Sequence, residues 1–220
     1  MSNNHAYDLL HTILVPDFFK TLYMVISATV LSTIIGMLLA VILIITYKEG
    51  LKPNKYIYEI LTTFINIVRS FPFIILIVAI IPVTRAIVGS SIGEKAAIIP
   101  LTIAGAPFIA RIIEGSLREV DKELIEAVKS FGATNFQIIF KVMLPEAVPS
   151  VISGITLAII SILGCTAMAG AVGAGGLGAI AITYGYANFD NTIMYGTVCV
   201  LIILVQIIQS IGNFLYKVLK

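Results

Sequence analysis

The amino-acid sequence predicts an all-α membrane protein that crosses the bilayer five times, as a single transmembrane domain over residues 1–220. Hydrophobic residues make up 59% of the 220 positions and charged residues only 12%, and the mean hydropathy is +1.04. These values lie far from those of soluble domains. Charged residues are clustered, so long uncharged runs alternate with short polar intervals. The net charge of +2 gives no global basic field that would favour nucleic acid as a partner.

The first predicted span lies in residues 21–47, which carry no charge. A helix needs about 20 residues to cross a hydrocarbon core of about 30 Å, so this run is long enough. Residues 1–17 are mostly polar, have no basic cluster and lead to no small-residue cleavage site. No signal peptide is therefore expected.

The second span falls between Tyr56 and Val88, an apolar stretch too long for one straight crossing. A break is predicted at Arg69–Pro72, where Ser70 can cap a helix and Pro72 suits a first helical turn or a kink. Arg69 is costly at membrane depth. It either extends to the headgroups or faces the interior of the bundle, where it would line a path.

The third span begins at Ala96 and runs to Ala110. Pro100, Gly105 and Pro107 make it irregular, which is common in helices that line transport paths. Arg111 and Glu114, three residues apart, are expected to form a solvated surface pair at its end.

The longest polar interval, at about residues 115–148, is dense with helix signals. Asp121 is predicted to cap a short helix from Lys122 to Phe131, which Gly132 ends in a left-handed conformation. Four apolar residues are expected to share one face of this helix: Leu124, Ile125, Val128 and Phe131. A capping box of Thr134 and Gln137 then opens a second helix, which Pro145 and Pro149 punctuate.

Residues 147–189 contain no charge, and these 43 positions exceed one crossing. Span four is expected to end near residues 169–174, where the sequence GAGGLG marks a loop or a close-packed corner. No strand precedes this sequence and no Lys-Ser/Thr pair follows it, so it is not a nucleotide loop. Its small residues are expected to let helices approach closely. Span five covers residues 192–216.

Five spans place the termini on opposite sides, and the positive-inside rule favours an external N-terminus and a cytoplasmic C-terminus. Ten of the fourteen basic residues are then cytoplasmic: Lys48, Lys52, Lys55, Arg111, Arg118, Lys122, Lys129, Lys141, Lys217 and Lys220. Lys20, Arg85 and Lys95 lie outside, and Arg69 is unassigned.

The polar interval resembles the EAA loop of ABC-importer permeases. Glu126, Ala127 and Val128 are followed after three residues by Gly132, and nine residues later Val142 precedes Leu144–Pro145. Val128 stands where a second alanine is commonest and Val142 where isoleucine is; both are small apolar changes. An ordinary amphipathic loop is the simpler alternative. A DNA-reading helix-turn-helix is rejected because no third helix or basic face accompanies it.

In that family the first helix of the loop is a coupling helix, which binds in a groove of a separate ATP-hydrolysing subunit. The resemblance therefore implies an ABC importer type I permease fold with no catalytic residue and no metal or cofactor of its own. ATP and Mg would be used by the partner ATPase. The residues implied in ATPase coupling are Leu124, Glu126, Ala127, Val128, Gly132, Leu144 and Pro145.

Over nearly its full length the chain resembles the methionine-uptake branch of these permeases, in RSFPFIILIVAIIPVTRAIVGSSIG, PLTIAGAPFIARIIEG and AMAGAVGAGGLGAIAITYGY. This resemblance implies a homodimer in the lipid of the bacterial cytoplasmic membrane, joined to two ATPase copies and supplied by an extracytoplasmic binding lipoprotein. Methionine would be imported by alternating access. The candidate path residues are Arg69, Ser70, Pro72, Ser161, Thr166 and Met168, although simple packing is the alternative for Met168.

The sequence leaves three alternatives. The first is an importer of another amino acid, because the binding lipoprotein does most of the substrate selection in this family. An ion-coupled secondary transporter usually has acids within its spans, whereas Glu59 and Glu114 lie at predicted cytoplasmic ends. An intramembrane enzyme is disfavoured because His5 and His11 both lie in the polar N-terminal segment, no His-Glu zinc pattern occurs and no serine lies beside a plausible base. No Walker A motif occurs either, so any ATP chemistry must come from another chain.

Overall fold

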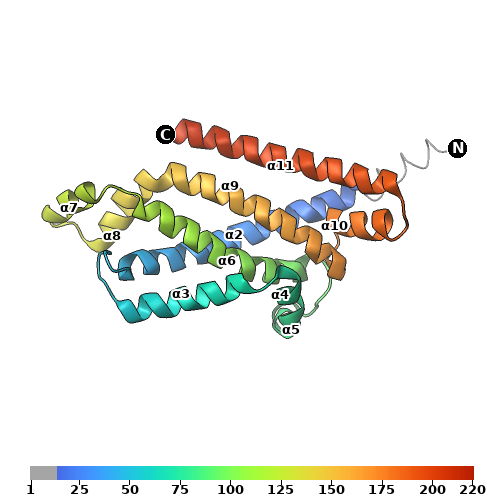
Figure 1. Cartoon of the computed structure of the whole chain (residues 1–220), viewed down its shortest axis with the longest axis horizontal. Coiled ribbons are helices and arrows are strands. Elements are labelled where there is room, and N and C mark those ends of the chain that lie inside the picture. The colour runs from blue at the N-terminus through green and yellow to red at the C-terminus, as the bar shows by residue number, and fades with distance from the viewer. Residues whose placement is uncertain (1–13) are drawn as a thin grey trace. The chain divides into compact units, whose positions relative to one another are not determined.

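The computed structural model describes residues 14–220, and over this range it contains helices and turns but no strand (Figure 1). The α-helices are α2 (Val15–Thr46), α3 (Lys55–Ser70), α4 (Phe73–Ala79), α5 (Ile81–Val88), α6 (Glu94–Arg118), α7 (Lys122–Ser130), α8 (Asn135–Ile138), α9 (Leu144–Ala169), α10 (Leu177–Ile180) and α11 (Asn191–Leu219). Shorter π-helical segments cover Ile139–Met143, Gly170–Ala174 and Ala181–Tyr186.

Four segments are long and apolar enough to cross a membrane: α2, α6, Asn135–Ala174 and α11. A fifth is obtained if α3 and α4, which meet at 102°, are counted as one broken span. The all-helical, five-span prediction is thus confirmed, with the broken span at the predicted place.

The break between α3 and α4 occurs at Pro72, as predicted, but without a cap from Ser70. The Ser70 hydroxyl donates back to the Asn66 carbonyl at 2.8 Å and does not cap α4, so that prediction was wrong. Pro72 is the residue before α4 and not within its first turn. Proline disfavours helical geometry at the preceding residue, so α3 ends before Phe71.

The expected interruption at Pro145 and Pro149 is absent. α8, the π-helical turn Ile139–Met143 and α9 follow one another directly, with Pro145 in the first turn of α9 and Pro149 inside it. The Leu144 amide donates to the Ile139 carbonyl, five residues back. This π-type hydrogen bonding changes the backbone register just before Pro145, where a regular bond would need the missing amide hydrogen.

The described residues form two compact units. The first contains residues 14–31, 71–104 and 159–208, and the second contains residues 32–70, 105–158 and 209–220. The core of the first includes Met24, Leu101 and Ile162. The core of the second is larger and includes Ile109, Ile113, Leu117, Ile138 and Met143. The prediction of a single domain over residues 1–220 stays a prediction.

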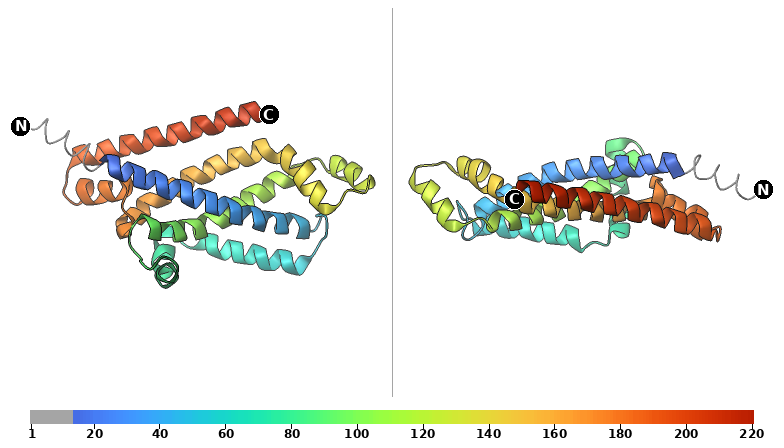
Figure 2. Two further views of the ribbon diagram at one scale, coloured as in Figure 1. Left: turned by 180° about the vertical axis from the view of Figure 1, so that it is seen from behind. Right: turned by 90° about the horizontal axis from the view of Figure 1, so that it is seen from above.

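Within the second unit, α7 and α8 lie at one end, beyond the C-terminal ends of α2 and α6 (Figures 1 and 2). The short turn from Glu119 to Asp121 carries the chain from the apolar helix α6 into the amphipathic helix α7. The polar interval of the sequence is therefore presented at the end of the helices.

Candidate functional site

Helix α7 begins and ends as its residues predict. The Asp121 carboxylate accepts a hydrogen bond from the Glu123 amide at 2.8 Å, which satisfies one free donor of the first turn. The helix ends at Ser130, one residue earlier than predicted, and Gly132 has φ +82°. A side chain in that left-handed conformation would be strained, so the predicted glycine stop is confirmed.

The second helix of the loop starts with the predicted capping box. The Gln137 amide donates to Thr134 Oγ1 at 3.3 Å, and the Thr134 amide donates to Gln137 Oε1 at 2.9 Å. The two bonds satisfy two otherwise free backbone donors. They also fix the direction in which the chain leaves Gly132, so α7 is held at both ends by short-range bonds.

The apolar face of α7 divides into two parts. Ile125 and Val128 pack partly against the core of the second unit. Leu124 and Phe131 instead have exposed fractions of 38% and 89%, so the face that helical spacing predicts is only partly buried. An apolar stripe this wide has one edge on the core and leaves the other edge uncovered.

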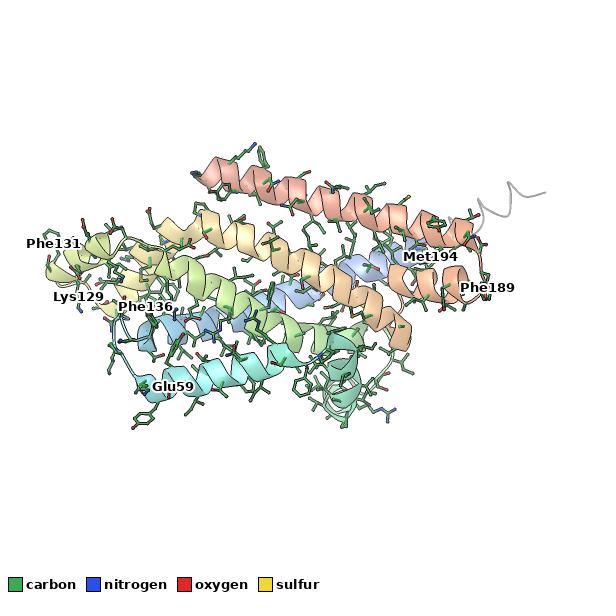
Figure 3. The ribbon with its side chains drawn as sticks, viewed as in Figure 1. Glu59, Lys129, Phe131, Phe136, Phe189 and Met194 are labelled. Carbon is green, nitrogen blue, oxygen red and sulfur yellow. The ribbon has the colours of Figure 1, made fainter. Side chains whose placement is uncertain are left out.

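More aromatic side chains lie at this end of the second unit. Phe136 is 67% exposed, and its ring centroid lies 4.5 Å from that of Phe140. Figure 3 shows Phe131 and Phe136 at this end, together with Lys129. We call Leu124, Phe131, Phe136 and Phe140 the end surface. Exposed apolar groups with polar residues at their rim are typical of a protein-binding site.

The other residues predicted to couple to an ATPase have mixed positions. Glu126, Ala127 and Pro145 are exposed, whereas Leu144 packs against the core of the second unit. Leu144 therefore anchors the loop to the core and is only partly exposed.

A polar contact ties the start of α7 to the turn after α2. The Lys122 ammonium donates a hydrogen bond to the Glu49 carboxylate. This bond lowers the pKa of Glu49 and raises the pKa of Lys122. Because the carboxyl pKa is lowered, the contact is retained at neutral pH and is lost only as the pH falls through that lowered value.

The predicted surface pair of Arg111 and Glu114 is wrong. The Glu114 side chain is only 3% exposed, and its carboxylate accepts from Arg111 at 2.8 Å, from Arg118, and from the Tyr58 hydroxyl at 3.2 Å. Arg118 lies four residues on, so its role was readable from helical spacing. Tyr58 is 56 residues away, and only the tertiary structure brings it here.

The candidate path residues differ in exposure and in their contacts. Arg69 is exposed, with its guanidinium carbon 5.9 Å from the Phe108 ring centroid. Ser161 and Met168 are exposed two helical turns apart on α9. Thr166 is buried, and its hydroxyl donates to the Leu163 carbonyl at 2.6 Å. Of the three candidates on α9, Ser161 and Met168 are exposed and Thr166 is buried.

The glycine-rich corner is confirmed as a site of close approach. A methyl group on Gly170 would lie 2.4 Å from the Ala179 nitrogen, and one on Gly178 would lie 2.3 Å from the Ala167 α-carbon. Gly173, Gly175 and Gly176 all have positive φ. The chain can turn here between α9 and α10 because these positions lack side chains.

Two residues near the start of α2 hold this corner, and the local sequence gave no sign of them. Asp17 accepts from the Gly176 amide at 3.1 Å, and Thr21 Oγ1 accepts from the Leu177 amide at 2.9 Å. Their partners are 159 and 156 residues away in sequence. Both bonds satisfy amides that the irregular corner leaves without helical partners.

Thr21→Val is expected to destabilise the protein by about 1–3 kcal/mol, because it leaves the amide of the buried Leu177 without an acceptor at nearly unchanged volume. The measurement is thermal unfolding in detergent, where each kcal/mol corresponds to about 2–4 °C for a chain of this size. Thr63→Val, at an exposed position of α3, is the matched control. Equal melting temperatures for the two variants would contradict the role of Thr21.

Apolar helices long enough to span a bilayer, with an amphipathic helix and a glycine turn exposed at one end of the second unit, define a polytopic integral-membrane protein with exposed apolar groups outside its spans. Residues 32–220 match the family model of the binding-protein-dependent transport system inner membrane component, and the chain belongs to this family. It is therefore a multi-pass permease of the inner membrane, not an enzyme.

Curated relatives agree with this assignment. A probable D-methionine transport system permease protein MetI from Vibrio cholerae is 52% identical, with 90% of this chain and 88% of the relative covered. The methionine import system permease protein MetP from Bacillus subtilis is 43% identical, with 81% and 80% covered.

Solved structures confirm the ABC importer permease fold. An inward-facing structure of the MetNI methionine ABC transporter matches with a TM-score of 0.95 and 42% identity, covering 100% of both chains. An amino acid ABC transporter solved with histidines matches with a TM-score of 0.75 at 18% identity over 92% of each chain, which shows the fold alone.

Proposed function

We propose that this chain is the permease subunit of an ATP-driven methionine importer, which moves the amino acid across the inner membrane by alternating access. The observation that carries the proposal is the whole-chain match to the MetNI methionine transporter. The curated permeases that cover most of this chain and bear methionine in their names support the same substrate. An importer of another amino acid is the second candidate.

The proposed complex contains two copies of this chain, two copies of a separate ATPase and an extracytoplasmic binding lipoprotein. Membrane lipid surrounds the permease, and no nucleic acid takes part. ATP and Mg are used in the ATPase, and this chain supplies no cofactor of its own. The separate ATPase is supported by the structural relative, an ABC transporter in which the matching permease is one subunit.

Coupling is assigned to α7 and the turn that follows it. Glu126 and Ala127 lie exposed on α7, and uncovered apolar groups are supplied by Leu124 on the same helix and by Phe131 directly after it. An amphipathic helix of 9 residues, with one polar and one apolar face, can bind in a groove of a partner protein. Ile125 and Val128 anchor its other side, so motion of the partner is transmitted to the core of the second unit.

The substrate path is proposed to include the outward-facing residues of α9, Ser161 and Met168. A hydroxyl and a thioether suit a partly polar, sulfur-containing amino acid. The other candidates are Arg69, Ser70, Pro72 and Thr166. Ser70 and Thr166 are the weaker ones among them, because their hydroxyls already donate to backbone carbonyls.

The substrate is tested by uptake of labelled methionine, glutamine, histidine and lysine into proteoliposomes that contain this permease with its own ATPase and binding protein. ATP-dependent uptake of methionine, in preference to the other three, is the expected result. Uptake of glutamine or lysine without methionine would contradict the substrate but leave the importer assignment in place. Vesicles without ATP serve as the control.

The proposed orientation has the N-terminus outside and the C-terminus in the cytoplasm. Cysteine placed at position 52 or 188, in a background lacking Cys165 and Cys199, is expected to react with a membrane-impermeant reagent from outside only at position 188. Lys52 and Asn188 are both exposed, so burial does not decide the result. Labelling of position 52 in intact cells would overturn the topology.

A further inference from the structure

One buried charge cluster in the second unit is not explained by its position in the bundle alone. Glu114, on α6, is 2% exposed as a residue and accepts hydrogen bonds from Arg111, Arg118 and Tyr58. Both carboxylate oxygens are engaged, Oε2 by Arg111 and Oε1 by Arg118 and Tyr58. A carboxylate closed in this way is not open to a substrate.

Burial of such a carboxylate is energetically unfavourable. Removing a carboxylate from water costs several kcal/mol, and the cost is offset only when good geometry and further hydrogen bonds satisfy the group. Packed hydrophobic residues would stabilise the helices at least as well. Stability alone therefore does not account for an acid at position 114.

The cluster links three elements. Arg111, Glu114 and Arg118 lie on successive turns of α6, and Tyr58 lies on α3. The Arg118 guanidinium also stacks over the ring of Tyr47, just after α2, with 3.6 Å between its carbon and the ring centroid. Cation–π contact of this kind gives Arg118 a fixed plane and holds the end of α2 against α6.

Two residues beyond Tyr47, Glu49 accepts the hydrogen bond from Lys122, the first residue of α7. A cavity of about 190 Å³ is lined by Tyr47, Glu49, Arg118 and Lys122, among others. Because this space is not filled by packed side chains, dispersion contacts position α7 from Ile125 onward but not at Lys122. The polar chain Glu114–Arg118–Tyr47 and the nearby Glu49–Lys122 contact take that role.

We propose that Glu114 is a positioning residue for energy coupling: by orienting Arg118 and Tyr58, it joins the ends of α2, α3 and α6 into one block that moves with α7. This inference rests on the proposed function, in which α7 receives the motion of the ATPase. Without the carboxylate, Arg111 and Arg118 would repel one another with no acid between them, and Tyr47 would lose its fixed partner. The helices would then respond to α7 separately.

The test uses the complete complex of permease, ATPase and binding protein in proteoliposomes, and measures the ratio of methionine imported to ATP hydrolysed. Glu114→Gln keeps the shape of the side chain and removes its charge. The ratio is expected to fall about fivefold or more, the lower end of coupling between protein sites. Glu59→Gln, at the exposed carboxylate paired with Lys55 on α3, is the matched control and is expected to keep the wild-type ratio (Figure 3 labels Glu59).

A merely structural role would give a different result. The amount of assembled complex would fall, and import and hydrolysis would fall together at an unchanged ratio, which would overturn the proposal. If Glu114→Gln does not assemble, Tyr58→Phe and Arg118→Lys carry the test. Tyr58→Phe removes the hydrogen bonds that the Tyr58 hydroxyl donates to Glu114 and accepts from Arg118, and Arg118→Lys removes the planar stacking on Tyr47. A wild-type ratio in both would also overturn it. Absence of ATP-dependent uptake by the wild-type complex would instead contradict the proposed function.

Discussion

Gly178→Ala is expected to destabilise the permease by about 3 kcal/mol or more, although it adds only one methyl group. That methyl would lie 2.3 Å from the Ala167 α-carbon and 2.7 Å from the Ala167 carbonyl oxygen, both backbone atoms. Backbone cannot yield as a flexible side chain does, so α9 and α10 must separate and lose their packing. Thermal unfolding in detergent and the yield of folded protein measure the effect.

Gly164→Ala provides the matched control for this change. Gly164 lies within α9, and a methyl group there would meet nothing within 4 Å. Alanine favours a helix over glycine by up to about 1 kcal/mol, so this variant is expected to be neutral or stabilised. The same chemical change should therefore have opposite signs at positions 164 and 178. Similar melting temperatures for the two variants would show that the corner is not closely packed.

Gly132→Asp and Glu126→Lys are expected to abolish transport while the permease stays in the membrane. Nothing lies within 4 Å of a side chain added at Gly132, so the change does not disturb the core. The φ of +82° strains any side chain at this position, although aspartate tolerates a left-handed φ better than most residues. The expected loss comes from placing a new charge where α7 binds the ATPase, at a cost of about 2 kcal/mol or more, which is about 30-fold in affinity.

The measurement is methionine uptake and permease-dependent ATP hydrolysis by the purified complexes. Gly132→Asn is the control, because asparagine has nearly the same size and backbone preference as aspartate but no charge. It is expected to keep substantially more activity than Gly132→Asp. If the double variant Gly132→Asp with Glu126→Lys stimulated and coupled the ATPase normally, α7 would not be the coupling helix.

The sequence by itself determined the features that depend on neighbouring residues. The span lengths follow from uninterrupted apolar composition, because lipid excludes charges. The cap at Asp121, the left-handed Gly132 and the capping box of Thr134 and Gln137 all depend on bonds within a few residues, and the structure has each of them. The break before α4 was found for the same reason, although Ser70 does not cap it.

Only the tertiary structure decided how distant segments use these elements. It placed Tyr58 and Tyr47 beside the charged residues of α6. Spacing alone had predicted a solvated surface pair there, whereas Glu114 is buried. It brought Asp17 and Thr21 to the glycine corner, and it divided the apolar face of α7 between core and surface. Whether a polar group is solvated or buried depends on which other helices pack over it. That packing cannot be predicted from the spacing of residues along one helix.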